Sequence, residues 1–530
     1  MKNKVNLILS NTYLSAFYGA LDDIKQKVEK DKFENIILVV PDKFSLNAEQ
    51  IVFDRLKCDT IFNVWLTTLS RLTAEVLEND LENCKILSKS SGTMLVGEII
   101  AKNKDKITAY KKVANDYSLA ETMFNAINLL KSSGITPTEI KANIKEDNFG
   151  DKLKDIFVIY DAYEKQLKTD KVDATTKLEM FDKKIKDCSL INNSHIYFAM
   201  FDSFTNAQIS SLVQLGKFAK SLTISLCANT TQNNKMIYDN VVFQRVKQAF
   251  ESQFLYPEIK NVYFNGSKRQ NFLLNNYFST TNVSKFETND VEIIKCDDTT
   301  QEIRLVASKI KSLAIENKFQ FKDIVVAVNG LEDYALQIKT IFDEYNLPYY
   351  LDISKTMSEH YFCKFLSNVF DFVLGRNTLF DAISIVKNPI VNFDFAEKET
   401  FENFCIKFNI MGEEFYKSFN FESSDECRVA EKVRNGVFGA IKTFADELAR
   451  ATIFDEKLDA MMDFLTKLDV KNSIENLAQK QLDPVDKSID EQIYGKFNEI
   501  VSEAREMLGA DGLENSVVFD IFKSVFKSTQ

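Results

Sequence analysis

The chain has 530 residues, 45% of them hydrophobic and 27% charged, and its formal net charge is −11 at pH 7. A chain of this length is too long to fold around a single hydrophobic core, so we expect about two to four domains. No signal peptide and no apolar run of about 20 residues is found, which predicts a cytoplasmic protein without a membrane partner. The negative charge excludes a global basic footprint for nucleic acid, although a locally basic channel stays compatible with it.

Cysteine and histidine usage narrows the chemistry further. The eight cysteines stand singly along the chain and there are only two histidines. Disulfide frameworks and zinc sites need closer or more regular spacing, so reduced core cysteines are the better interpretation. A histidine relay or a histidine-rich metal site is nearly excluded.

Short, almost continuously apolar runs recur in the first part of the chain, and helical patterns follow them. This is typical of strands that are covered on both faces in a parallel sheet. The runs are VNLIL (5–9), IILVV (36–40), IFNVWL (61–66), HIYFAMF (195–201) and SLTISL (221–226). Residues 81–187 carry helical patterns only, so we expect a helical insertion into an α/β domain made of residues 1–80 and 188–290. Within the insertion, Gly134 ends one helix, and Thr136, Pro137 and Glu139 open the next.

A second α/β unit is predicted over residues 291–358. Strand-like runs at 291–296, 322–328 and 347–353 alternate with helical patterns at 300–318 and 334–346. From residue 359 to 530 the pattern is helical again. Two α/β units with helical insertions are the layout of a two-lobed helicase motor, and an unrelated multidomain α/β protein fits the pattern about as well.

Several stretches resemble the N-terminal half of the AddB/RexB family, the B subunit of the bacterial ATP-dependent helicase–deoxyribonuclease. They occur in family order and together span nearly the whole chain. They are ILVVPDKFSLNAEQIVF (37–53), VWLTTLSRLTAEVL (64–77), NLLKSSGITPTEI (128–140), FAMFDSFTNAQ (198–208), residues 322–362 and FENFCIKFNIMGEEFY (401–416).

The resemblance implies a superfamily 1 helicase-like fold with two RecA-like parallel-sheet domains and large all-helical insertions. It also implies a nuclease domain with Mg and an iron–sulfur cluster further toward the C-terminus. No nuclease motif occurs up to Gln530, so we expect a truncated chain without a cofactor of its own. The implied partners are an AddA/RexA-type subunit and single- and double-stranded DNA ends.

The loop after the first predicted strand tests for nucleotide binding. A phosphate cradle needs glycines for close backbone approach and a lysine for charge, whereas residues 10–15 read SNTYLS. Asp202 stands where an ATPase strand places its first carboxylate, but Ser203 replaces the second. We therefore expect a degenerate nucleotide site at Ser10, Asn11, Thr12 and Asp202, and no ATPase or nuclease activity in this chain alone.

The carboxyl ends of the other predicted strands carry hydroxyls, cations and an aromatic ring. These groups suit a track for single-stranded DNA, and in the family this face scans the translocating strand. The expected DNA-binding residues are Lys43, Ser45, Thr68, Ser70, Arg71, Phe204 and Thr205. The alternative is that the hydroxyls cap the helices that begin there.

Four weaker expectations concern the second half of the chain. His360 is expected to cap or pack a helix, and Glu302 with Arg304 to form a surface ion pair. Tyr349 and Tyr350 are expected in a core. The apolar stripe formed by residues 517, 518, 521, 522 and 526 is expected to lack cover.

The preferred function is a non-catalytic scaffold that tracks single-stranded DNA in an AddAB/RexAB-type complex for double-strand break repair and homologous recombination. An active ATP-driven motor with an atypical phosphate loop is one alternative. A protein-interaction remnant without a DNA role is the other.

Overall fold

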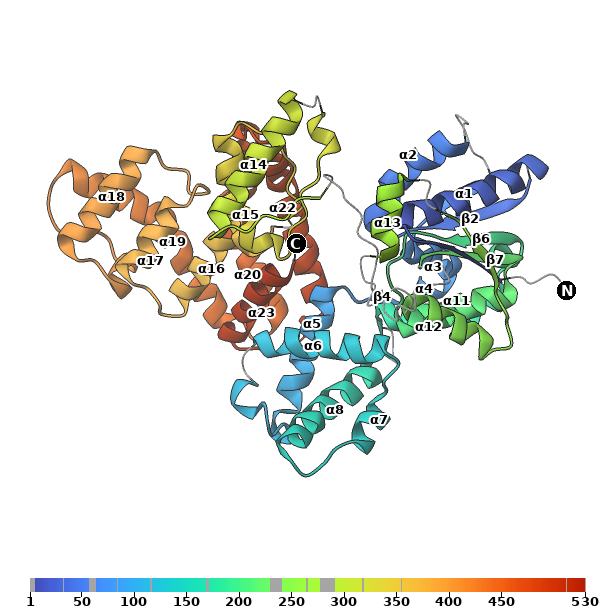
Figure 1. Ribbon diagram of the computed structural model, residues 1–530. Coiled ribbons are helices and arrows are strands. Elements are labelled where there is room, and N and C mark those ends of the chain that lie inside the picture. Colours follow the sequence, from blue (N-terminus) through green and yellow to red (C-terminus); the bar gives the residue numbers. More distant parts are fainter. Residues whose placement is uncertain are drawn as a thin grey trace.

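The computed structural model describes residues 5–31, 33–56, 63–82, 84–114, 117–167, 171–228, 241–263, 266–276, 291–316, 319–353, 355–510 and 512–529. These residues form a six-stranded α/β domain, a large helical module and a smaller pair of helices (Figure 1). None of the helices in these ranges combines the length and apolarity of a membrane span.

The α/β domain is built on a parallel sheet with the strand order β3-β2-β6-β7-β1-β8. Its strands are β1 (Val5–Ser10), β2 (Asn35–Val39), β3 (Val64–Thr67), β6 (Ser194–Phe198), β7 (Ser221–Cys227) and β8 (Glu258–Asn261). The five predicted strands are therefore confirmed, and residues 61–62 of the third lie outside the described residues. The edge strand β8 was missed because its polar, exposed residues carry no apolar run.

Helices cover both faces of this sheet, as the apolar runs predicted. Strand residues alternate between the faces, so that Leu7 and Leu9 lie in one core and Ile8 in the other. The face of Ile8 is covered by α1 (Tyr13–Lys30) and α2 (Ser45–Leu56). The opposite face is covered by α3 (Leu69–Val76), α9 (Ala174–Lys184), α11 (Asn206–Phe218) and α12 (Val241–Glu251).

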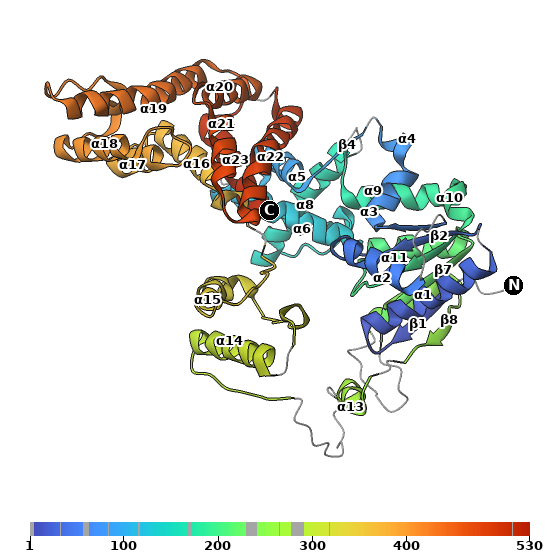
Figure 2. The ribbon, with the colours of Figure 1, turned by 90° about the horizontal axis from the view of Figure 1, so that it is seen from above.

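The helical module combines two segments that are far apart in the sequence (Figures 1 and 2). One hydrophobic core includes residues from Leu87 to Leu167 and from Met357 to Phe526. The first segment supplies α5 (Lys89–Lys102), α6 (Tyr117–Ser132), α7 (Pro137–Ala142) and α8 (Asn148–Leu167). The second supplies α16 (Tyr361–Val373), α17 (Leu379–Lys387), α18 (Phe395–Phe408), α19 (Asp425–Arg450), α20 (Phe454–Lys467), α21 (Val470–Lys480), α22 (Pro484–Leu508) and α23 (Asn515–Ser528). Helical periodicity alone could not show that these two segments share a core, because it identifies an apolar face and does not identify the segment that packs against it.

The contacts between the two segments explain two details of the sequence. Ser88 and Ser90 each donate a hydrogen bond of 2.6 Å to Glu503 on α22. The apolar stripe on α23 is buried in the shared core, with Ile521 and Phe522 at most 1% exposed. The expectation that this stripe lacks cover was wrong, because α16 and α22 supply the apolar surface.

Residues 291–353 form the smaller unit, in which α14 (Thr299–Glu316) packs on α15 (Leu331–Glu344) (Figure 2). The predicted strands at 291–296, 322–328 and 347–353 are not assigned as strands. Ile324, Val328 and Tyr349 contact the helices, but Tyr350 is 84% exposed, so its expected burial was wrong. Arg304 pairs with Glu344 at 3.2 Å, and Glu302 instead accepts a hydrogen bond from Tyr334.

Candidate nucleic-acid interface

The strand order of the sheet places a topological switch point between β2 and β6. The chain leaves β2 toward the edge strand β3, and it leaves β6 in the opposite direction, toward β7. The following helices, α2 and α11, accordingly lie on opposite faces. In open parallel sheets the crevice at such a switch point, beyond the carboxyl ends of the strands, is where ligands bind.

The connection after β1 contains no phosphate cradle. Only Asn11 and Thr12 separate the strand from α1, and the Thr12 hydroxyl accepts the amide of Ser15 at 3.2 Å as an N-cap. Ser10 is fully buried, and its hydroxyl has no hydrogen-bond partner among the described residues. A loop this short cannot wrap a β-phosphate with successive backbone amides.

The turn after β6 brings Asp202 close to the start of α1. Met200 has φ of 66°, which is unusual for a residue with a side chain. Asp202 is exposed and accepts a hydrogen bond from Ser203 at 3.3 Å. Burial, Cys227 and Asp202 together raise the pKa of Tyr13 at the start of α1. Tyr13 was missed by the sequence reasoning, which treated the loop only as a phosphate site.

The ends of β2 and β3 present two exposed cations. Lys43 and Arg71 are both exposed, and neither forms an ion pair among the residues that the structure describes. The hydroxyls near them serve the helices: Ser45 donates to the carbonyl of Asp42 at 2.9 Å, and Thr68 accepts the amide of Arg71 at 3.4 Å. The capping alternative thus accounts for Ser45 and Thr68 and leaves the two cations free for a ligand.

A cavity of about 200 Å³ lies at the same edge, between the ends of β2 and β3 and helix α9. Its lining includes Asp42, the exposed Ser70 and Lys177. Burial lowers the pKa of Lys177, and its ammonium has no hydrogen-bond partner among the described residues. An unpaired, partly buried ammonium favours an anion nearby. Sequence reasoning missed Lys177 because it lies in the helical insertion, far from the strand ends in the chain.

The last two predicted contacts follow β6. Phe204 is 3% exposed and stacks on Phe201 with ring centroids 5.1 Å apart, so its ring offers no free face to a base in this conformation. Thr205 is exposed and forms a capping box with Gln208 at the start of α11. Arg71, Lys43, Lys177 and Ser70 remain the groups best placed for a ligand.

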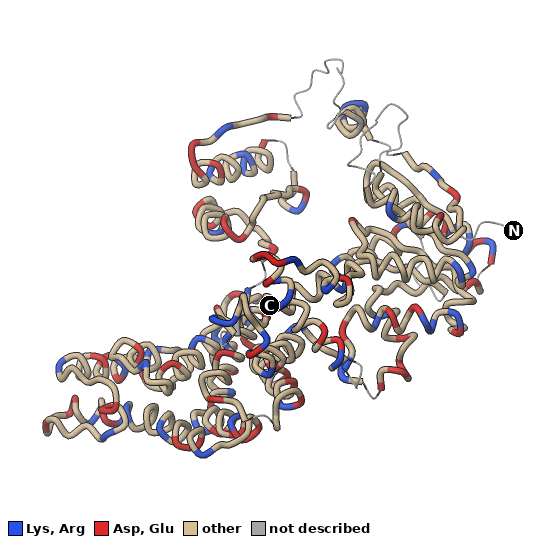
Figure 3. The backbone as a smooth tube through the Cα atoms, turned by 90° about the horizontal axis from the view of Figure 1, so that it is seen from below, with Lys and Arg blue, Asp and Glu red and all other residues tan. Residues whose placement is uncertain are grey.

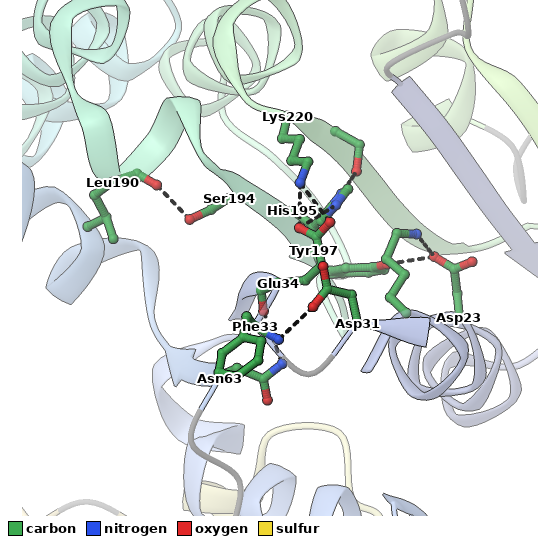
Figure 4. Close-up of polar contacts among 12 residues, drawn as sticks. Asp23, Asp31, Phe33, Glu34, Asn63, Leu190, Ser194, His195, Tyr197 and Lys220 are labelled. Carbon is green, nitrogen blue, oxygen red and sulfur yellow. Dashed lines mark hydrogen bonds and ion pairs between the residues drawn. The ribbon is translucent and has the colours of Figure 1, made fainter. Parts of the chain in front are cut away.

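The opposite, amino-terminal edge of the sheet holds a polar cluster whose members bind one another (Figure 4). Glu34 accepts from Lys220 at 2.5 Å and lies 3.3 Å from Nε2 of His195, whose Nδ1 is 2.5 Å from the Ser221 hydroxyl. Tyr197 donates to Asp23 at 2.6 Å. Burial lowers the pKa of His195. The cluster is a satisfied structural network.

Lys and Arg alternate with Asp and Glu over the helical module, as Figure 3 shows. The fold is that of a doubly wound α/β protein, and the carboxyl edge of its sheet carries exposed cations and hydroxyls, with no phosphate cradle in the described connection after β1.

The family model described as "ADDB, N-terminal" matches residues 18–268. The chain is 25% identical to the B subunit of the ATP-dependent helicase/deoxyribonuclease of Clostridium novyi (strain NT), over 96% of this chain and 46% of that protein. It is 23% identical to the protein of the same name from Clostridium botulinum (strain Langeland), over 96% and 47%. Residues 18–268 are thus similar to the N-terminal part of AddB, and the chain spans about half the length of these curated relatives.

Proposed function

We propose that this chain is the helicase-like, non-catalytic part of a helicase–deoxyribonuclease of the AddAB/RexAB type and holds single-stranded DNA at the carboxyl edge of its sheet. In this proposal the α/β domain is RecA-like, and an AddA/RexA-type partner supplies ATP hydrolysis and translocation. The complex would act on DNA ends in double-strand break repair.

The observation that carries the proposal is the pair of unpaired cations at the switch-point edge. Arg71 and Lys43 are exposed there without an ion-pair partner in the described ranges, and the cavity with Lys177 lies beside them. A guanidinium can hold a phosphate with two hydrogen bonds or lie flat on a base. The short β1–α1 connection favours this interpretation over an active motor, because it offers no cradle for a nucleotide.

The test is a salt titration of oligonucleotide binding by the purified chain and its Arg71→Ala variant. We expect the variant to lose about 1–3 kcal/mol of binding free energy if the arginine holds a base. If it holds a phosphate, the salt slope of a single strand should fall by about 0.7. The matched control is Arg55→Ala, since Arg55 is an exposed arginine that pairs with Asp22 at 2.9 Å.

Three results would contradict the proposal. Equal binding by the Arg71→Ala and Arg55→Ala proteins would remove the sheet edge from the DNA path. No salt-sensitive binding by the parent chain would favour a protein-interaction role. Specific binding of an ATP analogue would favour the motor alternative, because an active motor must bind ATP.

A further inference from the structure

A second, larger cavity lies in the helical module, away from the sheet edge. Its volume is about 840 Å³, within the range of about 300–1,000 Å³ that small-molecule sites occupy. It is lined by residues from Lys355 to Lys364, which contain the start of α16, and by residues from Gln481 to Lys496 on α21–α22. Neither segment belongs to the candidate nucleic-acid interface described above.

The floor of this cavity is a buried carboxylate with fixed neighbours. The Asp490 side chain is 3% exposed and accepts hydrogen bonds from His360 Nε2 at 2.8 Å and from Gln481 Nε2 at 3.2 Å. His360 Nδ1 accepts the amide of Phe362 at 3.2 Å, so the ring is the neutral tautomer with its proton on Nε2. Both ring nitrogens are used, which confirms that this histidine caps α16.

The carboxylate of Asp490 keeps acceptor capacity for a ligand. A carboxylate has about four lone-pair sites, and His360 and Gln481 occupy only two of those on Asp490. The buried hydroxyl of Tyr361 lies next to Asp490, and burial together with this carboxylate raises the pKa of the tyrosine. The floor therefore suits a ligand that presents N–H donors.

The walls and the rim have different chemistry. Met357, Ile489 and Ile493 form an apolar lining. Lys355, Lys364 and Lys496 also line the cavity, and Lys364 is exposed without an ion-pair partner in the part of the chain that the structure describes.

Carboxylates balance these lysines only weakly. Lys355 pairs with Asp486 and Lys496 pairs with Glu499, and all four side chains are at least 36% exposed. Such exposed pairs contribute little, so an incoming anion can replace them at low cost. Glu359 is the remaining carboxylate in the lining, and it is exposed.

We propose that this cavity binds a nucleotide, either free or as one unit of a single strand. The amino and imino groups of the base would donate to Asp490, and its ring would lie against Ile489 and Ile493. The phosphate would lie at the rim, near Lys364 and Lys496. Carboxylates accept from exocyclic amino groups in base recognition, and lysines hold phosphates as point charges.

The test uses equilibrium dialysis with each of the four deoxynucleoside monophosphates and with a short photo-crosslinkable single strand of mixed sequence. We expect crosslinks to peptides from residues 355–364 or 481–496. The doubly substituted Lys364→Ala/Lys496→Ala chain should bind about tenfold more weakly, which corresponds to about 1.4 kcal/mol. Its salt slope on the strand should fall by about 1.4, because about 0.7 is lost per phosphate contact.

The base contact has its own variant. Asp490→Asn should remove the preference for nucleotides with an exocyclic amino group over thymidine monophosphate. The control is Lys487→Ala, since Lys487 is exposed on the same helix and does not line the cavity. Because both lysines of the double variant are exposed, its folding should match that of the parent in a thermal melt.

The outcomes separate the two sources of the ligand and the two proposals. Monophosphate binding at the cavity supports a free nucleotide, and binding of the strand alone supports a strand unit. Binding of neither, or equal binding by the double variant and Lys487→Ala, overturns the inference. Weaker strand binding by Arg71→Ala with intact crosslinks at 355–364 would support the sheet edge as an independent site. Unchanged strand binding by Arg71→Ala with crosslinks at 355–364 would leave only the cavity.

Discussion

Gly92 on α5 provides a sharp test of the helical core, because an added methyl group has no room there. A Cβ at this position would lie 2.3 Å from Cζ and 2.4 Å from Cε2 of Phe124 on α6. Phe124 is 5% exposed and packs edge-on against Tyr163, so its ring cannot swing into solvent. The clash must therefore be absorbed by the packing of α5 on α6.

The magnitude follows from two opposing effects. Overpacking in a core costs about 1–3 kcal/mol, and we take the upper part of this range because the approach is so close. Replacing a helical glycine by alanine contributes about 1 kcal/mol of stability. We expect Gly92→Ala to lower the free energy of unfolding by about 1–2 kcal/mol.

The matched control is Gly495→Ala on α22. A Cβ there would meet nothing within 4 Å, and the residue is exposed. Only the helix-propensity gain remains, so this variant should be about 0.5–1 kcal/mol more stable than the parent.

The assay is urea unfolding followed by circular dichroism, with hydrogen exchange of α5 and α6 to localise the change. In a Phe124→Leu background the alanine at position 92 should be tolerated, which gives a coupling energy of about 1–2 kcal/mol. The reasoning is refuted if Gly92→Ala stabilises the chain as Gly495→Ala does, or if no coupling with residue 124 is measured.

Further predictions concern buried ionisable groups and the absent nucleotide cradle. Burial lowers the pKa of His195 and His360 below 6.5, so the unfolded chain binds more protons and the free energy of unfolding should fall as pH drops below about 6.5. His360→Asn, which keeps an N-cap, should weaken this dependence in urea midpoints measured across pH. Lys131→Met should lower the free energy of unfolding by about 3–5 kcal/mol, because Lys131 is the buried ion-pair partner of Asp173 at 2.9 Å and its loss leaves this carboxylate unpaired. The purified chain should release no phosphate from ATP, and DNA-stimulated release that Asp202→Ala abolishes would contradict this.

The sequence by itself determined the local elements of this protein. Continuous apolar runs identified the buried parallel strands, because a strand covered on both faces has no polar side. Gly134, with φ of 78°, ends α6 as predicted, and the capping box of Thr136 and Glu139 opens α7. These features depend on neighbours in the chain, so pattern was sufficient to find them.

Only the tertiary structure decided how distant segments meet. It joined residues 87–167 and 357–526 in one core and buried the stripe on α23. It placed Lys177 beside the strand ends and buried Phe204, and it brought Asp490 to His360 across 130 positions. Periodicity shows that a face of a helix must be covered. The free energy of burial depends on apolar area and has no directional preference, so it does not specify which segment covers the face. Only the packed chain shows that partner.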